Sequence, residues 1–109
     1  MSLTSSTSDG HLRLQVSGGF TIFQADDYKP QLLALLEQPA DLLEVDLQGI
    51  DEIDTAGLQL LLMMKREAAT RHKRLVFHGM SPAMQDMVDM LHLHDSFNVP
   101  PPVGLQGLA

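Results

Sequence analysis

The segment from Asp51 to Gly57 places several oxygen-bearing side chains between a predicted strand and a predicted helix. Carboxylates at this spacing could form a catalytic acid–base pair or hold Mg²⁺. Asp54 and Thr55 could instead accept hydrogen bonds from the free N–H groups at the start of the helix, where the helix dipole also favours a carboxylate. We expect the capping role and no catalytic residue, because acidic loops of this kind commonly have no other function.

Other motifs for enzymatic or metal chemistry are missing from the sequence. The histidines do not form an H-E-x-x-H pattern, and neither a G-x-S-x-G elbow nor a glycine-rich phosphate loop is present. His92 and His94 would face nearly opposite sides of a helix, which disfavours a shared metal. Cysteine is absent, which excludes a thiol nucleophile and a disulfide. We expect no enzyme, no metal and no cofactor.

Composition indicates a single domain that does not bind nucleic acid. The chain has 109 residues and a net charge of -7, which disfavours contacts with phosphates. Nine of its fourteen acids lie between residues 26 and 54, and five of its seven bases lie between residues 65 and 74. The acids are either an ordinary solvated face or a surface for a protein partner. The chain shows neither a signal-peptide pattern nor an apolar run long enough for membrane insertion, so we expect a cytoplasmic protein.

The hydrophobic pattern predicts an α/β fold in which helices pack on a mixed β-sheet, in the order β-β-α-β-α-β-α. The predicted strands are residues 11–17, 20–23, 42–48 and 73–79, and Gly18-Gly19 joins the first two as a hairpin. The predicted helices run from Asp26 or Asp27 to about Gln38, from about Thr55 to Arg71, and onward from Pro82 after a Ser81 cap. Residues 1–10 are expected to be a flexible tail, residues 11–97 the domain, and residues 98–109 a proline-rich tail.

The helix that follows Asp54 carries two apolar stripes where one is enough for a core. Leu58, Leu61, Leu62 and Ala69 form the expected core face. Ala56, Leu60 and Met63 lie on nearly the opposite side, with Met64 beside them. The second stripe is either buried as well or a docking surface for a partner, since methionine-rich patches suit adaptable binding.

Thr55 is a candidate switch in addition to a candidate cap. A phosphate on its hydroxyl would add about -1.5 to -2 charges, which a helix N-terminus tolerates. A partner with an acidic or apolar surface would then be repelled while the domain stayed folded.

The chain from residue 11 to residue 97 resembles the STAS domain, which is shared by anti-sigma factor antagonists and the cytoplasmic tails of sulfate transporters. The resemblance rests on the segment "LEVDLQGIDEIDTAGLQLLLMMKREAATRHKRLVFHGMSPAMQDMVDMLHL", in which an apolar strand leads into D-T-A-G-L at the start of a helix. The upstream segment "GGFTIFQADDYKPQLLALL" has a similar pattern. The resemblance to the STAS domain implies a sheet backed by helices and no catalytic activity.

The resemblance also implies a protein partner, namely a bacterial anti-sigma factor or a serine kinase, bound around the D-S/T motif. We therefore expect partner contacts from the D-T-A-G-L corner and from the second stripe: Asp54, Thr55, Ala56, Gly57, Leu58, Leu60, Met63 and Met64. Many related proteins are switched by phosphorylation of a Ser or Thr between the Asp and the Gly, and Thr55 is the one hydroxyl at that place here.

Ala56 departs from the two-hydroxyl pattern D-S-[ST]-G of many regulated relatives. If the acceptor has to directly precede Gly57, this chain cannot be phosphorylated there. The D-T-A-G-L variant resembles small STAS proteins of chemotaxis or two-component signalling. It equally resembles the STAS subunit of a lipid-transport ATP-binding cassette complex, whose partner is the transporter ATPase. The oligomeric state does not follow from the sequence.

Overall fold

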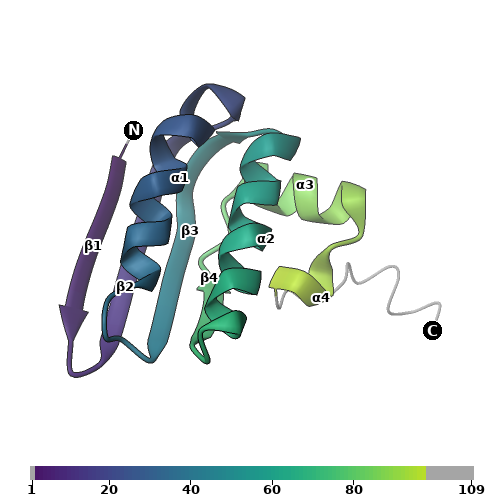
Figure 1. Ribbon diagram of the computed structural model, residues 1–109. Coiled ribbons are helices and arrows are strands. Elements are labelled where there is room, and N and C mark those ends of the chain that lie inside the picture. The colour runs from purple at the N-terminus through teal and green to yellow at the C-terminus, as the bar shows by residue number, and fades with distance from the viewer. Residues whose placement is uncertain (1, 98–109) are drawn as a thin grey trace.

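The computed structural model describes residues 2–97 of the chain (Figure 1). In this part, strands and helices alternate as predicted, and a short helix is added at the end. The elements are β1 (Ser2–Ser8), β2 (His11–Phe20), α1 (Ile22–Leu36), β3 (Leu42–Ile53), α2 (Thr55–Thr70), β4 (Arg74–His78), α3 (Pro82–Leu91) and α4 (His94–Phe97). The α/β class and the element order are confirmed. The predicted proline-rich tail, 98–109, lies outside the described residues.

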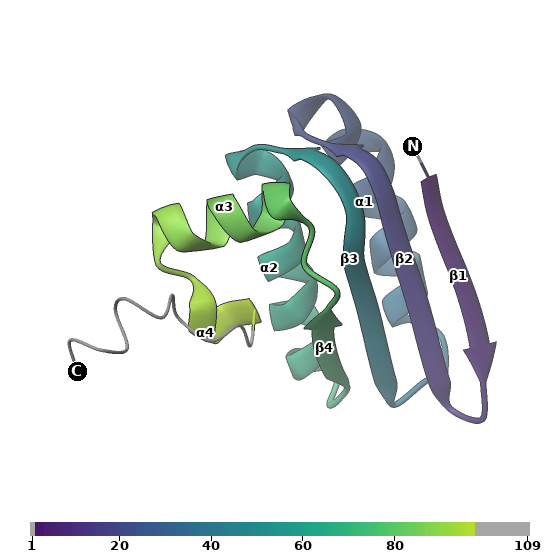
Figure 2. The same cartoon turned by 180° about the vertical axis from the view of Figure 1, so that it is seen from behind.

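The four strands form one mixed sheet in the order β1-β2-β3-β4. Strands β2, β3 and β4 are parallel, and β1 is antiparallel to β2. Helices α1 and α2 lie side by side on one face of the sheet, and α3 and α4 lie beyond β3 on the β4 side (Figures 1 and 2). Because parallel strands run in one direction, β2 and β3 both end where α1 and α2 begin.

Alternation along the strands separates the core from a polar face. Leu12, Leu14 and Val45 are fully buried beneath the helices. Their neighbours point to the other face, where Glu44 lies 3.4 Å from the Arg13 Nε atom. Figure 2 shows that face without a helix across β1, β2 and β3. None of the helices within residues 2–97 combines the length and apolarity needed to cross a membrane.

The prediction of a flexible tail at residues 1–10 is wrong for Ser2–Ser8, which form β1. β1 pairs with β2 through a two-residue loop, since Ser8 is opposite His11. The loop residues Asp9 and Gly10 have φ values of 52° and 75°. Asp-Gly is the preferred pair for such hairpin loops, so this turn signal was available in the sequence. Polar serine and threonine side chains suit an edge strand whose outward positions meet solvent.

The predicted hairpin at Gly18-Gly19 is also wrong, because β2 continues through both glycines to Phe20. The chain shifts register against β3 there instead of turning back. α1 then begins at Ile22 rather than after Asp26 or Asp27. Residues 20–23, predicted as a strand, therefore span the end of β2 and the start of α1.

The cap of α1 explains its early start. The Thr21 hydroxyl accepts a hydrogen bond from the Phe23 N–H, and the Gln24 side chain accepts one from the Thr21 N–H at 2.8 Å. This reciprocal capping box satisfies donors that would otherwise lack partners. Because α1 starts at Ile22, Pro30 lies inside the helix rather than in its first turn.

β3 is longer than predicted, because Gly49 does not break it. A side chain at Gly49 would lie 2.8 Å from the Ser17 Cβ atom, so the missing side chain lets β2 and β3 stay paired across the register shift. The later elements match the predictions closely. α2 spans Thr55–Thr70, and Ser81 caps α3 with Pro82 at its first position.

Gly57 is the point at which α2 meets the end of β2. A Cβ atom on Gly57 would lie 1.9 Å from the Phe20 carbonyl oxygen, far inside van der Waals contact. Glycine is therefore required for the first turn of α2 to reach the sheet. The distance between α2 and β2 is set by backbone atoms rather than by side chains that could adapt.

Gly57→Ala is expected to destabilise the domain by about 2 kcal/mol or more, since overpacking against backbone outweighs the better helix propensity of alanine. Urea denaturation followed by circular dichroism measures the change. Gly10→Ala is the control, because no atom lies within 4 Å of its Cβ position and its cost comes from a φ of +75° alone. That cost is about 1 kcal/mol. Equal losses of unfolding free energy in the two variants would contradict the close approach of Gly57 to the Phe20 carbonyl oxygen.

Candidate functional site

The Asp54 carboxylate caps two helices at once. Its Oδ1 atom accepts a hydrogen bond from the Gly57 N–H, in the first turn of α2, at 3.0 Å. Its Oδ2 atom accepts one from the Ile22 N–H, the first residue of α1, also at 3.0 Å. The predicted capping role of Asp54 is confirmed. The hydrogen bond to α1 adds to the predicted role, because one side chain fixes the starts of both helices relative to each other.

These two hydrogen bonds also set the charge state of Asp54. The N–H groups of Gly57 and Ile22 lower the pKa of the carboxyl below its usual value. Two helix N-termini, each with a positive end of the helix dipole, favour the ionised form further. Asp54 is therefore an anion at neutral pH, and its negative charge is part of the joint between the helices.

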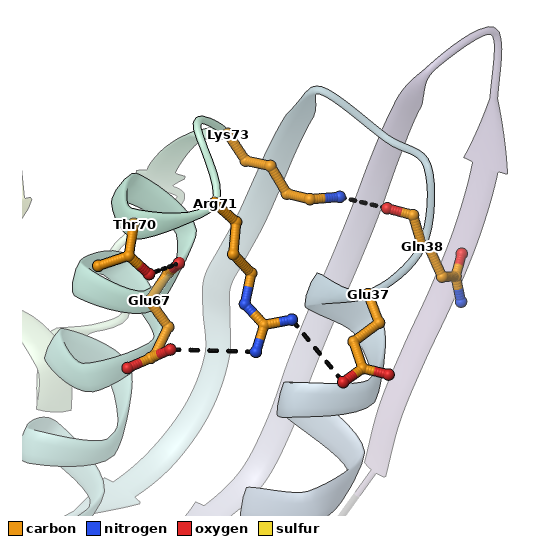
Figure 3. Close-up of polar contacts among 6 residues, drawn as sticks. All are labelled: Glu37, Gln38, Glu67, Thr70, Arg71 and Lys73. Atoms are coloured by element: carbon orange, nitrogen blue, oxygen red, sulfur yellow. Dashed lines mark hydrogen bonds and ion pairs between the residues drawn. The ribbon is translucent and has the colours of Figure 1, made fainter.

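A second set of contacts holds the opposite ends of the same helices (Figure 3). The Arg71 guanidinium lies 3.8 Å from a Glu37 oxygen and 4.0 Å from a Glu67 oxygen, which links the end of α1 to the end of α2. The Lys73 ammonium donates to the Gln38 carbonyl oxygen and, at 2.9 Å, to the Ala40 carbonyl oxygen. α1 and α2 are thus joined at both ends.

Thr55 is the first residue of α2, and its side chain is exposed. The structure gives the capping role to Asp54, so the fold does not depend on the Thr55 hydroxyl at this position. Ala56 is half-buried beside it. The corner therefore presents one accessible hydroxyl directly next to an ionised carboxylate.

A shallow groove of about 260 Å³ runs between α1 and α2 from this corner. Its lining residues are Ala25, Asp26 and Lys29 from α1 and Ala56, Gln59, Leu60, Met63 and Arg66 from α2. The middle of the groove is apolar. The end away from Asp54 carries two bases, Lys29 and Arg66. We call this feature the α1–α2 groove.

The second apolar stripe divides between the core and the groove. Met64 is fully buried, which favours the burial alternative at that position, whereas Leu60 is 7% exposed and lines the groove. Leu58 and Gly57 are buried as well. Met63 is half-buried and lines the groove. The cause is α1, which packs beside α2 and covers most of the stripe.

Two core assignments in α2 also change. Ala69, predicted on the core face, is exposed, and Ala68 is buried in its place. Leu62 is half-buried. A shift of one residue on a helix rotates the buried face, which hydrophobic spacing alone did not resolve.

Sequence reasoning missed two exposed apolar residues at the start of α1. Ile22 is 62% exposed and Phe23 is 85% exposed. Both belong to residues 20–23, for which the sequence predicts a strand. The Thr21–Gln24 capping pattern was the signal that could have placed them on the first turn of a helix instead.

The other titratable residues do not form a metal site in the part of the chain that the structure describes. No group of three His, Asp or Glu side chains among residues 2–97 is placed to hold a metal ion. His92 ends α3 with a φ of 55°, whereas His94 is buried with its Nε2 atom 2.7 Å from Asp89. That contact lowers the pKa of Asp89 and fastens α4 to α3.

Comparisons with known proteins identify the fold. A family model described as Mlab, STAS domain, matches residues 3–103. An anti-sigma factor antagonist from Mycobacterium paratuberculosis has a similar structure, with 19% identity over 94% of this chain and 87% of that chain, and a TM-score of 0.74. The phosphorylated form of the Bacillus cell fate determinant SpoIIAA gives 13% identity over 98% and 96%, with a TM-score of 0.68.

A sulfate transporter family protein from Wolinella succinogenes is also similar, with 17% identity over 84% of this chain and 75% of that chain, and a TM-score of 0.67. A search of curated protein sequences finds no match. At these identities the solved structures show a shared fold, and the site must be argued from this chain's own residues.

Asp54→Ala is expected to destabilise the domain by about 2 kcal/mol at pH 7, because two helix starts lose a charged acceptor. The lowered pKa means that this stabilisation is present above the unfolded-state pKa of about 3.9 and is lost as pH falls through the folded-state pKa. The difference in the free energy of unfolding between Asp54→Ala and the wild type should therefore become smaller below about pH 4. Urea titrations at pH 7 and pH 3 measure it.

Asp51→Ala is the matched control, since Asp51 is an exposed acid near the end of β3, three residues before Asp54. We expect its effect to stay within about 0.5 kcal/mol at both pH values. If Asp54→Ala behaves like Asp51→Ala at pH 7, the double cap does not stabilise the fold.

Proposed function

The chain belongs to the family described as Mlab, STAS domain, and from this we propose that it is a non-enzymatic signalling domain that binds a regulatory protein partner. The expected partner is an anti-sigma factor, a serine kinase, or a component of a two-component or chemotaxis system. The fold shared with anti-sigma factor antagonists supports the proposal. No cofactor takes part in this function.

The exposure of Thr55 is the observation that carries the proposal. Asp54 supplies the cap of α2, so a threonine at the next position is not required for folding. An exposed hydroxyl held on two fixed helix starts is well placed for a partner contact, since little flexibility has to be lost on binding. The docking surface that we propose consists of Asp54, Thr55, Ala56 and Met63.

Phosphorylation of Thr55 would act on this surface through charge. Asp54 already occupies N–H groups of both helices, and Asp51 and Glu52 add two more acids nearby in sequence. A phosphate would place up to about two further negative charges on the corner. The fold would tolerate them at a helix N-terminus, whereas a partner fitted to the unmodified corner would be repelled.

A second candidate is an accessory subunit of a lipid-transport ATP-binding cassette complex, bound to the transporter ATPase. Ala56 favours this alternative. Its methyl group lines the α1–α2 groove at the place where a second hydroxyl would stand in a regulated relative. An apolar groove beside a single hydroxyl suits a permanent contact, in which Thr55 touches the ATPase and is not modified.

Thr55→Glu is expected to weaken binding of the natural partner at least about tenfold, or ~1.4 kcal/mol, because it adds a charge at the contact. The partner is first purified with the wild-type chain from cells that produce both. Titration calorimetry with the purified partner then gives the affinity, and circular dichroism confirms that the variant is folded. The identity of the partner decides between the signalling and transporter roles.

Thr4→Glu is the control, since Thr4 is an exposed threonine of β1, on the far edge of the sheet. Its affinity should stay within about twofold of the wild type, as expected for a surface change outside the interface. Wild-type affinity for the folded Thr55→Glu protein would refute a docking surface at this corner.

A further inference from the structure

Ile22 and Phe23 have a degree of exposure that the fold does not explain. They are 62% and 85% exposed at the first two positions of α1. The first turn of a helix favours acidic residues, and the cap is provided by Thr21 and Gln24. Neither helix formation nor the core thus requires a large apolar residue at either position. Exposed aromatic residues beside other apolar surface typically mark an interface.

The double cap places these residues next to the Thr55 corner. Asp54 binds the Ile22 N–H directly and adjoins Thr55 in the chain. Ile22 lies one turn before Ala25, which lines the α1–α2 groove, so the two residues share one side of α1. An apolar strip therefore runs from the exposed first turn of α1 into the groove.

The strip is surrounded by acids at the helix starts and by bases at its far end. Residues 14–28 and 48–64, which include the ends of both strands and the starts of both helices, contain no Lys or Arg. They contain five acids, which are Asp26, Asp27, Asp51, Glu52 and Asp54. At the far end of the groove, Lys29 and Arg66 supply positive charge.

We propose that Ile22 and Phe23 anchor a partner protein that presents an apolar pocket rimmed by Lys and Arg side chains. Phe23 fills the pocket, and Ile22 continues the contact into the α1–α2 groove. The acidic rim around Asp54 pairs with the bases of the partner, which sets the orientation of the complex. This proposal rests on the proposed function and adds a second half to its docking surface.

Charge also selects the kind of occupant. A second copy of this chain would bring five acids toward only two groove bases, Lys29 and Arg66, so most of its acids would face no base, which opposes such a dimer. The net charge of -7 opposes the dimer further. A basic partner gains attraction from the same residues, and the fixed geometry of the two helices lowers the cost of ordering the anchor.

Phe23→Ser tests the anchor against the purified natural partner. We expect the dissociation constant to rise at least about tenfold, as for a central aromatic residue of an interface. Met90→Ser is the control, because Met90 on α3 is also a largely exposed apolar residue, at 65%, and lies on another helix. Its dissociation constant should remain within about twofold of the wild type. Equal affinities of Phe23→Ser and the wild type would overturn the proposal.

The basic rim of the partner is tested separately by charge. Asp26 and Asp27 are exposed, and neutralising both as Asp26→Asn and Asp27→Asn should slow association and reduce its dependence on salt. Surface plasmon resonance at low and high salt measures both rates. If the association rate of the doubly neutralised variant is equal to or higher than that of the wild type, a basic partner is excluded.

The results separate this inference from the proposed function. If Thr55→Glu loses the partner and Phe23→Ser keeps it, the anchor is refuted while the docking corner stands. If both variants bind normally, the docking surface at the Thr55 corner is refuted as well. Sedimentation of the protein alone tests whether a second copy of this chain occupies the surface instead. A dimer that dissociates in the Phe23→Ser variant would overturn the proposal.

Discussion

The arrangement of this domain depends on one carboxylate that joins two helix N-termini. Asp54 accepts hydrogen bonds from the Ile22 and Gly57 N–H groups, so α1 and α2 start at a common point. Gly57 brings that point against the Phe20 carbonyl oxygen, where no side chain fits. Two segments far apart in the sequence, residues 20–22 and 54–57, thus meet through the Asp54 carboxylate and a close backbone contact. Backbone contacts of this kind leave little freedom for the corner to move.

The rest of the structure makes this corner a rigid platform rather than a loop. The parallel strands β2 and β3 end together beneath it, and their buried residues hold both helices to one face of the sheet. Arg71 and Lys73 fasten the opposite helix ends. The groove between the helices therefore has fixed walls. Binding at such a surface needs little reorganisation, which suits a domain that we propose acts by protein contact and not by chemistry.

The sequence predicted those features that depend on local patterns. The Asp54 cap, the bounds of α2 and the Ser81-Pro82 start of α3 each rest on a few adjacent residues, and the structure confirms them. Where two local signals competed, the prediction chose wrongly: Gly18-Gly19 was interpreted as a turn, although Asp9-Gly10 makes it. The burial of Met64 and Leu60 follows from α1 packing beside α2, a long-range contact that helical spacing cannot show. The exposure of Phe23 follows instead from the start of α1 at Ile22, which the local Thr21–Gln24 cap sets.

The central claim is that the joined starts of α1 and α2 form the surface that a partner covers. Hydrogen–deuterium exchange of the domain, alone and with its purified partner, tests it most directly because it maps the covered backbone without any mutation. The account predicts added protection in residues 21–26 and 54–63. Protection confined to β1 and the polar face of the sheet, with both of these segments unchanged, would contradict it.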